Sequence, residues 1–418
     1  MIQFEDVLAA EPRVARFAAK TPIRLWEHLR RQLSFEAPVF LKLETLQNTG
    51  AFKVRGASNK ILGLIENGQA PKHVVAASAG NHAQAVAFVA GRLKIPATIV
   101  MPQGAPLVKA AATRDYGAQV ILHGSVYDDA YARAQQLLQE IPGSVYVHAY
   151  EDPLIAAGQG TLGLEFHQQM LEAGCSDDDV QLVVPIGGGG LISGVATAIR
   201  KLRPRAKIFG VVCQAAPAMA ESFQKGQVIT VSQGASRRSR TLGEGLAVKK
   251  VSPLTFDIIK REVEDIAIVD DDEMARAIAS LMERGKLVVE GSGAAGVAAA
   301  LAGKLKLNPK KPIGFVLCGG NIDMNLVSNI LERGLSKDGR WLRMKVTVED
   351  KPGELARLAS LIGEAQANIL EVQHDRITAN CPVGSTIIMF HVETRGREHA
   401  QELERLIQSK GYQVEVNP

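Results

Sequence analysis

Short apolar runs rich in Val and Ile recur along most of the chain, separated by longer stretches with apolar residues at helical spacing. The runs predict strands at Val39–Leu43, Val74–Ala77, Thr98–Met101, Gln119–Leu122, Val145–His148, Leu182–Ile186, Ile208–Val212 and Gly314–Leu317. Ala-rich segments such as Ala83–Leu93 and Leu191–Leu202 predict helices. Continuous apolar strands that alternate with helices are typical of parallel sheets covered on both faces. We therefore expect an α/β body.

The pattern changes after Ser336–Arg340, a polar cluster that predicts a turn and a domain boundary. Beyond it we expect strand Leu342–Val348, turn Asp350–Gly353, helix Glu354–Glu364, strands Asn368–His374 and Ser385–Val392, helix His399–Ser409 and strand Tyr412–Val416. This βαββαβ order is the ferredoxin-like arrangement. The predicted domains are residues 1–335 and 341–418.

Composition narrows the classes of function. A net charge of +4 on 418 residues is too weak for a nucleic-acid partner. No signal peptide and no run of about 18 apolar residues is visible, so we expect neither secretion nor a membrane span. The cysteines are far apart and form no CxxC pair, which argues against a zinc site or a disulfide framework and favours a reducing cytoplasm. They are Cys175, Cys213, Cys318 and Cys381.

Four consecutive glycines, Gly187, Gly188, Gly189 and Gly190, follow a predicted strand and open a predicted helix. Backbone N–H groups without neighbouring Cβ atoms can face one concavity at a helix N-terminus, which suits a phosphate. A tight turn between strand and helix is the alternative interpretation. A P-loop needs a Ser or Thr after Gly-Lys, which neither Gly285–Leu287 nor Gly303–Leu305 supplies, so nucleotide hydrolysis is disfavoured. The dinucleotide motif fails in spacing, so hydride transfer is disfavoured as well.

Lys53 lies in the segment Asn48–Gly56, among small and apolar neighbours. A lysine at a helix start is usually a solvated surface charge. Burial among such neighbours would instead lower the pKa of the amine and make it a nucleophile toward a carbonyl cofactor. A phosphate cradle together with a reactive lysine suggests pyridoxal phosphate.

Two further polar segments follow predicted strands, where open α/β sheets gather ligands. Ser78–Gln84 includes Asn81 and His82, and its polar groups suit a carboxylate and a phenolic oxygen. The second segment is Cys318–Asn321, whose glycines allow close approach of a ligand. Taken singly, Cys318 is more simply a small buried residue and His82 a buried or capping one.

These motifs together resemble threonine dehydratases, which are fold-type II pyridoxal-phosphate enzymes of the tryptophan-synthase β superfamily. The segments that carry the resemblance are Gly50–Ala57, Ser78–Gln84, Gly158–Thr161, Gly187–Gly190 and Cys318–Asn321. The resemblance covers about residues 1–335. It implies two open parallel-sheet subdomains, the smaller of about residues 50–150 being inserted in the larger.

The resemblance also implies roles for individual residues. Lys53 would hold the cofactor as a Schiff base and act as the base at Cα, with Phe52 packed beside the ring. Asn81 would donate to the phenolic oxygen, Gly187–Gly190 would bind the phosphate, and Cys318 would face the pyridine nitrogen. Ser78, Gly80 and Asn81 would hold the substrate carboxylate.

The tail resembles a single ACT domain, a module that binds amino acids as allosteric effectors. The matching segments are Val348–Leu355 and Ala367–Ile369. The resemblance implies an effector near Pro352, Gly353, Asn368 and Ile369, across an interface in a homo-oligomer, either a dimer or a tetramer. The effector's identity stays open, as does the choice between isoleucine synthesis and threonine breakdown.

Three alternatives to a threonine dehydratase remain. Serine racemases are similar but have a serine at the position of Ala79, where its hydroxyl would reprotonate Cα from the opposite face. Serine dehydration is a second alternative, because one missing methyl group costs only about 1–3 kcal/mol of discrimination. A third is a non-catalytic amino-acid sensor, against which Lys53 argues.

Overall fold

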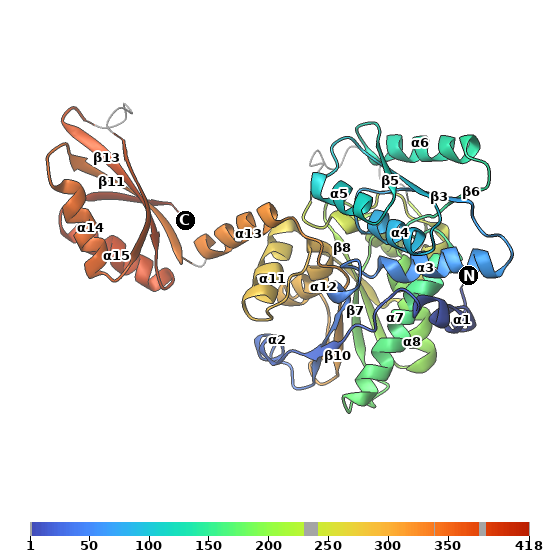
Figure 1. The fold of residues 1–418 in the computed structure, drawn as a ribbon. Helices are drawn as coiled ribbons and strands as arrows, with labels where there is room; N and C mark the ends of the chain where they lie inside the picture. Colours follow the sequence, from blue (N-terminus) through green and yellow to red (C-terminus); the bar gives the residue numbers. More distant parts are fainter. Residues whose placement is uncertain (1, 230–240, 338, 376–381, 418) are drawn as a thin grey trace. The chain divides into compact units, whose positions relative to one another are not determined.

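The computed structural model describes residues 2–229, 241–337, 339–375 and 382–417, which fall into two compact units, Met1–Ile322 and Asp323–Pro418 (Figure 1). Each unit has its own apolar core. Cys381 lies outside the described residues. The first unit ends before the expected boundary, so the domain limits 1–335 and 341–418 stay a prediction.

The first unit contains two sheets. The larger has the order β1 (Ile23–Leu25), β2 (Val39–Leu43), β10 (Ile313–Leu317), β7 (Gln181–Pro185), β8 (Lys207–Cys213) and β9 (Asp265–Val269), and only β1 is antiparallel to its neighbour. The smaller is parallel throughout, with the order β5 (Gln119–Leu122), β4 (Ala97–Met101), β3 (His73–Ala77) and β6 (Ser144–Tyr146). The carboxyl ends of β3, β7 and β10 lead directly into the candidate segments.

Helices surround both sheets in Figure 1. They are α1 (Phe4–Val14), α2 (Glu27–Gln32), α3 (Lys53–Glu66), α4 (Asn81–Arg92), α5 (Leu107–Asp115), α6 (Tyr127–Glu140), α7 (Pro153–Glu172), α8 (Gly190–Leu202), α9 (Ala218–Lys225), α10 (Pro253–Glu262), α11 (Asp271–Glu283) and α12 (Gly291–Leu301), with short 3-10 turns η1 (Glu44–Leu46) and η2 (Glu244–Leu246). Helix α7 packs against both α3 and α8, and so ties the lysine helix to the glycine-loop helix. In the described part of the chain, no helix has both the length and the apolar composition needed to cross a membrane.

The second unit begins with α13 (Met324–Lys337) and continues as β11 (Trp341–Glu349), α14 (Glu354–Glu364), β12 (Asn368–Asp375), β13 (Ser385–Glu393), α15 (Arg397–Ser409) and β14 (Gln413–Asn417). Its antiparallel sheet has the order β12-β13-β11-β14. Leu358, Ile362, Leu403 and Ile407 of the two helices pack on the alternating apolar positions of the strands. The predicted α/β body and βαββαβ tail are both confirmed.

Three local expectations were wrong. The strand expected at Val145–His148 ends at Tyr146, because the His148 ring turns back to accept N–H bonds from Tyr150 and Glu151. Strands β1 and β9 were not expected: β1 is short, and its middle residue is an arginine.

The third difference concerns the polar cluster Ser336–Arg340. Ser336 and Lys337 belong to α13, and the turn comes after them. Gly339 adopts a φ of 68°, and its N–H donates to Ser336 O at 2.9 Å, while the N–H of Arg340 donates to Leu335 O at 2.8 Å. A glycine in this left-handed conformation commonly follows the end of a helix, which agrees with α13 ending at Lys337.

Candidate active site

Lys53 is the first residue of α3, and its amine lies against the main chain of a distant segment. The Nζ atom donates to Ala149 O at 3.0 Å and lies 5.1 Å from the centroid of the Phe52 ring. Burial lowers the pKa of Lys53 to about 8, although Cys318 and Glu290 act against that shift. About a tenth of such an amine is neutral at pH 7, far more than of an ordinary lysine. Lys53 is therefore suited to act as a nucleophile or a base.

The segment after β10 is fastened to the turn before Lys53. The Phe52 N–H donates to Cys318 O at 3.0 Å, and Ala51 pairs with Gly319 in an isolated bridge. Burial raises the pKa of the Cys318 thiol well above its ordinary value, so the group stays a neutral thiol. The fold thus brings two predicted site residues, Lys53 and Cys318, into one place.

The glycine loop connects β7 to α8 as expected. Gly189 has a φ of 88° and precedes the first helical residue, Gly190. Within the described chain, no group accepts a hydrogen bond from the N–H of Gly187, Gly188 or Gly189. A Cβ on Gly188 would lie 2.1 Å from the Tyr150 ring. Unpartnered N–H groups at a helix N-terminus have the chemistry to hold a phosphate.

The loop and the lysine are linked through two consecutive residues. Lys53 contacts the carbonyl of Ala149, and the ring of Tyr150 covers the loop at Gly188. The Tyr150 hydroxyl donates to Lys250 O at 3.3 Å, which fixes the ring from its far end. Tyr150 was missed from the sequence, because a single aromatic residue after a strand carries no distinguishing pattern.

Ser78, Gly80 and Asn81 form the entry to α4. Ser78 Oγ accepts the N–H of Gly80 at 3.2 Å, and a Cβ on Gly80 would meet nothing within 4 Å. The next residue, Asn81, donates from Nδ2 to Glu290 Oε1 at 2.7 Å and accepts at Oδ1 from Asn321 Nδ2 at 2.9 Å. The structure therefore joins the segment after β3 to the segment after β10. Open space beside a helix N-terminus suits a carboxylate.

His82, the neighbouring residue, is buried and satisfied. Its Nε2 pairs with Val147 O at 2.8 Å, and burial lowers its pKa to about 3. It is therefore a neutral core histidine, as the simpler of the two interpretations held.

Glu290 is a second residue that the sequence analysis missed. Burial raises its pKa to about 7, with Lys109 and the hydrogen bond from Asn81 opposing that rise. It lies 209 residues from Asn81 in the chain. The signal available was weak: one acidic residue just before a helix made of glycine, serine, alanine and valine, with a single leucine.

These groups fit pyridoxal phosphate. A lysine amine matches its aldehyde, N–H groups at a helix N-terminus match its phosphate, and a neutral thiol and an amide match its ring nitrogen and phenolic oxygen. Among the described residues, no cluster of three or more His, Cys, Asp or Glu side chains is placed to hold a metal ion.

A network of buried charges lies behind Lys53. Arg55 donates to both oxygens of Glu44 and both oxygens of Glu165, at 2.8 to 2.9 Å. Lys42 donates to Glu165 at 2.8 Å and to Gln169 at 2.9 Å. Although burial opposes it, pairing with the carboxylates raises the pKa of Arg55, so the guanidinium stays charged. The network ties β2, α3 and α7 together two residues from Lys53.

The predicted effector residues are not brought together within one chain. Gly353 has a φ of 98° and precedes α14, whereas Asn368 begins β12 beside Glu393, to which its side chain donates at 3.5 Å. Strand β11 runs from Trp341, beside Glu393, to Glu349, near Pro352. Pro352 and Gly353 therefore lie at one end of the sheet, and Asn368 and Ile369 at the other.

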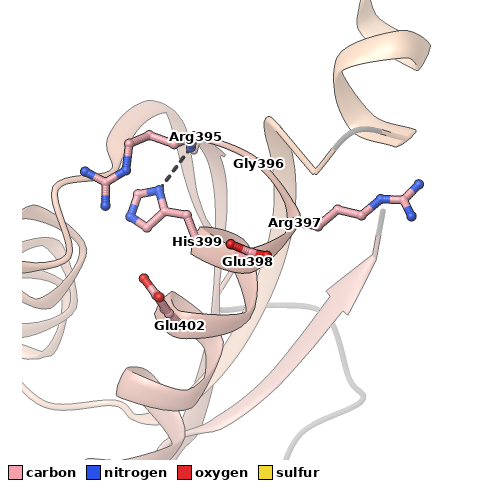
Figure 2. A pocket seen from close by; sticks show the side chains of 6 residues that line it. All are labelled: Arg395, Gly396, Arg397, Glu398, His399 and Glu402. Carbon is pink, nitrogen blue, oxygen red and sulfur yellow. Dashed lines mark hydrogen bonds between the residues drawn. The ribbon is translucent and has the colours of Figure 1, made fainter. Parts of the chain in front are cut away.

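A hollow of about 500 Å³ lies in the second unit, and Figure 2 shows the residues that line it. It is lined by Arg395, Gly396, Arg397, Glu398, His399 and Glu402. His399 is satisfied, since Nδ1 accepts the Arg395 N–H at 3.0 Å and Nε2 pairs with Ala365 O at 2.6 Å. The residues that line the hollow include both arginines and glutamates, and none of them is a predicted effector residue.

Comparison with known proteins finds a matching family for each of the two units. Residues 14–319 match the family model of pyridoxal-phosphate dependent enzymes, and residues 343–408 match that of the ACT domain. The chain is 44% identical over 416 residues to an L-threonine ammonia-lyase of Geobacter sulfurreducens and 43% identical over 417 residues to one of Thermotoga maritima, each alignment covering 100% of both chains. The solved structure of maize serine racemase, 32% identical, matches with a TM-score of 0.71 over 80% of this chain and 98% of that one. The chain belongs to the pyridoxal-phosphate dependent enzymes and carries a C-terminal ACT domain.

Proposed function

We propose that this protein converts L-threonine to 2-oxobutanoate and ammonia. The observation that carries the proposal is the half-buried Lys53 amine, whose pKa burial lowers to about 8. It donates to Ala149 O, next to the Tyr150 ring that covers the glycine loop, and the N–H of the preceding residue, Phe52, donates to Cys318 O. The full-length likeness to two L-threonine ammonia-lyases supports threonine as the substrate.

The cofactor would be held by residues of four segments. Lys53 provides the covalent attachment, and Phe52 packs beside the ring. Gly187, Gly188, Gly189 and Gly190 bind the phosphate through main-chain N–H groups. Asn81 donates to the phenolic oxygen, and the neutral Cys318 thiol faces the pyridine nitrogen. When bound, pyridoxal phosphate withdraws electrons from the substrate's Cα and so makes the proton on it acidic.

The substrate carboxylate would be held at the start of α4. Ser78 offers a hydroxyl, Gly80 leaves space, and the N-terminal N–H groups of the helix offer donors and a partial positive charge. The Lys53 amine, in its neutral form, would take the Cα proton of the substrate. That proton and the β-hydroxyl leave as water; hydrolysis of the released enamine then consumes one water and gives 2-oxobutanoate and ammonia.

Cys318 and Ala79 direct the outcome. A neutral thiol does not hold the pyridine nitrogen protonated as a carboxylate would, so less negative charge is delocalised into the ring and elimination is favoured over transamination. Ala79 has only a methyl group, which cannot return a proton to the opposite face of Cα. Racemisation is therefore disfavoured, whereas L-serine is expected as a side substrate.

The ACT domain would make the enzyme responsive to an amino acid. Since Pro352 and Gly353 lie at the opposite end of the sheet from Asn368 and Ile369, an effector that contacts both pairs needs a second copy of the domain. Strand β12 is an edge strand and is available for such pairing. We therefore infer a homo-oligomer, a dimer or a tetramer, under allosteric control. An isoleucine-synthesis role and a cytoplasmic location stay predictions.

One assay tests substrate, reaction and regulation together. Keto-acid formation is measured with L-threonine, L-serine and D-serine, each with and without isoleucine and valine. We expect the highest kcat/KM with L-threonine, and chiral chromatography of the L-serine reaction should show no D-serine. A colourless protein that stays colourless when given pyridoxal phosphate would instead favour a non-catalytic sensor.

A further inference from the structure

Asn81 is held from both ends by side chains of other segments. Asn321 donates from Nδ2 to Asn81 Oδ1 at 2.9 Å and to Thr49 O at 2.8 Å, which uses both of its N–H groups. Glu290 accepts from Asn81 Nδ2 at 2.7 Å. A carboxylate can only accept and the Asn321 amide nitrogen can only donate, so together they determine which end of the Asn81 amide carries the nitrogen. One N–H of Asn81 then remains for a ligand.

Glu290 is placed for this contact and not for its own helix. It is the N-cap residue of α12, yet its side chain makes no capping hydrogen bond. Its backbone N–H donates to Gly319 O at 3.1 Å, which anchors it to the segment after β10. A Cβ on Gly319 would lie 2.4 Å from Glu290 Oε1. The glycine in the Cys318–Asn321 segment therefore makes room for this carboxylate.

Charged groups from several elements surround the carboxylate. Lys109 of α5 and Lys53 of α3 favour its ionised form, and Glu244 of η2 opposes it. Glu290 in turn raises the pKa of the Cys318 thiol after β10. Lys109 and Glu244 form an ion pair with each other. Against these influences burial raises the pKa of Glu290 to about 7, so the carboxylate is ionised only from neutral pH upward.

We propose that Glu290 is a positioning residue, which holds the Asn81 amide so that its second N–H meets the phenolic oxygen of the cofactor. This inference rests on the proposed function, because it takes Asn81 to be the partner of that oxygen. Removing the carboxylate leaves the Asn81 amide held by Asn321 at its oxygen alone. The nitrogen end is then less well fixed, which weakens cofactor binding and changes the cofactor's absorption. The ionised carboxylate is the stronger acceptor, so the clamp tightens as pH rises through about 7.

The test compares Glu290→Ala and Glu290→Gln with the control Glu264→Ala, which removes an exposed glutamate that pairs with Arg200. Pyridoxal phosphate is titrated into each apoprotein, and the visible spectrum is recorded between pH 6 and pH 9. We expect Glu290→Ala to weaken cofactor binding by about tenfold and to shift the absorption maximum. Glu290→Gln keeps an acceptor and its affinity, but loses the change in spectrum near pH 7.

A double-mutant cycle separates positioning from an independent role. In the Asn81→Ala background, Glu290→Ala should change neither cofactor affinity nor spectrum any further. Additive effects would overturn the proposal, as would a Glu290→Ala protein with the control's affinity and spectrum. If Glu290→Ala fails to fold, the isosteric Glu290→Gln decides, and an unaltered pH dependence of its spectrum is the contrary result. A wild type that never binds pyridoxal phosphate would instead contradict the proposed function.

Discussion

The two units use charged side chains in opposite ways. In the first unit Lys42, Glu44 and Arg55 are completely buried and bonded to one another or to Glu165. Among the described residues of the second unit, the buried polar side chains are those of Thr386, Thr394 and His399, and none is Lys, Arg, Asp or Glu. Its core is otherwise aliphatic and aromatic.

This difference reflects what each unit must hold in place. A buried ion pair is costly to desolvate, and its gain depends on good geometry, so it tolerates little displacement. Such a network suits the start of α3, where Lys53 has to meet a cofactor. Apolar contacts in a core do not depend on the precise direction in which each side chain points. The charged residues of the second unit stay at the surface, where a second copy or an effector can reach them.

The largest expected effect is on catalysis, from Lys53→Ala. In the proposed function Lys53 is both the cofactor attachment and the base, so kcat with L-threonine should fall by about a thousandfold or more. Circular dichroism should show an unchanged fold. The matched control is Lys345→Ala, on an exposed position of β11, which should retain full turnover. If the Lys53→Ala protein still dehydrated L-threonine at a substantial rate, Lys53 would not be the attachment and base proposed for it.

The next effect is on stability, from Arg55→Ala. Removing the guanidinium leaves the buried Glu44 and the partly buried Glu165 with Lys42 as their remaining cationic neighbour, which should lower the free energy of unfolding by about 3–5 kcal/mol. Arg343→Ala, at an exposed position of β11, should change it by less than about 0.5 kcal/mol. Urea denaturation followed by circular dichroism measures both. Equal losses in the two variants would show that burial of charge is not what distinguishes the units.

A smaller effect is the acid sensitivity contributed by His82. Burial lowers its pKa to about 3, against about 6.5 in an unfolded chain, so the unfolded state binds more protons between these values. Stability from this residue is complete above pH 6.5 and is lost as pH falls, by about 2 kcal/mol between pH 7 and pH 5. His82→Gln should reduce that dependence, whereas His374→Gln, at an exposed position of β12, should not. Denaturation curves at several pH values decide.

The sequence was informative where one short segment carries the signal. The buried strands β2 and β4 are continuous apolar runs, and Gly187–Gly190 and Cys318–Asn321 follow strands in the expected way. Glu290 and Arg55 could not be found like this. Each takes its role from partners far away in the chain, and a charged residue in a sequence is normally a solvated one.

The effector residues show a different limit of the sequence. Pro352 and Asn368 are close in the chain, and the sequence suggested one binding region. The antiparallel pairing of β13 with both β11 and β12 places them at opposite ends of the sheet. Strand register, which depends on the whole sheet, therefore decides whether two neighbouring motifs can share a ligand.

The smallest expected effect on catalysis comes from removing the ACT domain. The candidate active-site residues all lie before Ile322, and the hydrogen bonds described above for Lys53, Asn81 and Cys318 are to residues of the first unit. Truncation after Gly334 should therefore leave kcat and KM for L-threonine nearly unchanged, while any response to isoleucine, valine or another amino acid disappears. Truncation after Ile322 removes α13 as well and tests whether that helix belongs to the second unit, as its contacts indicate.

The two truncated proteins also separate regulation from assembly. An effector can bias the enzyme only by binding its states unequally. If effectors bind between ACT domains, both truncated proteins lack the binding site and should lose the response. Calorimetry with isoleucine and valine on the full-length protein supplies the reference. A soluble protein truncated after Gly334 that keeps the full-length response would place the effector in the first unit, where the polar residues are committed to buried networks and to the cofactor.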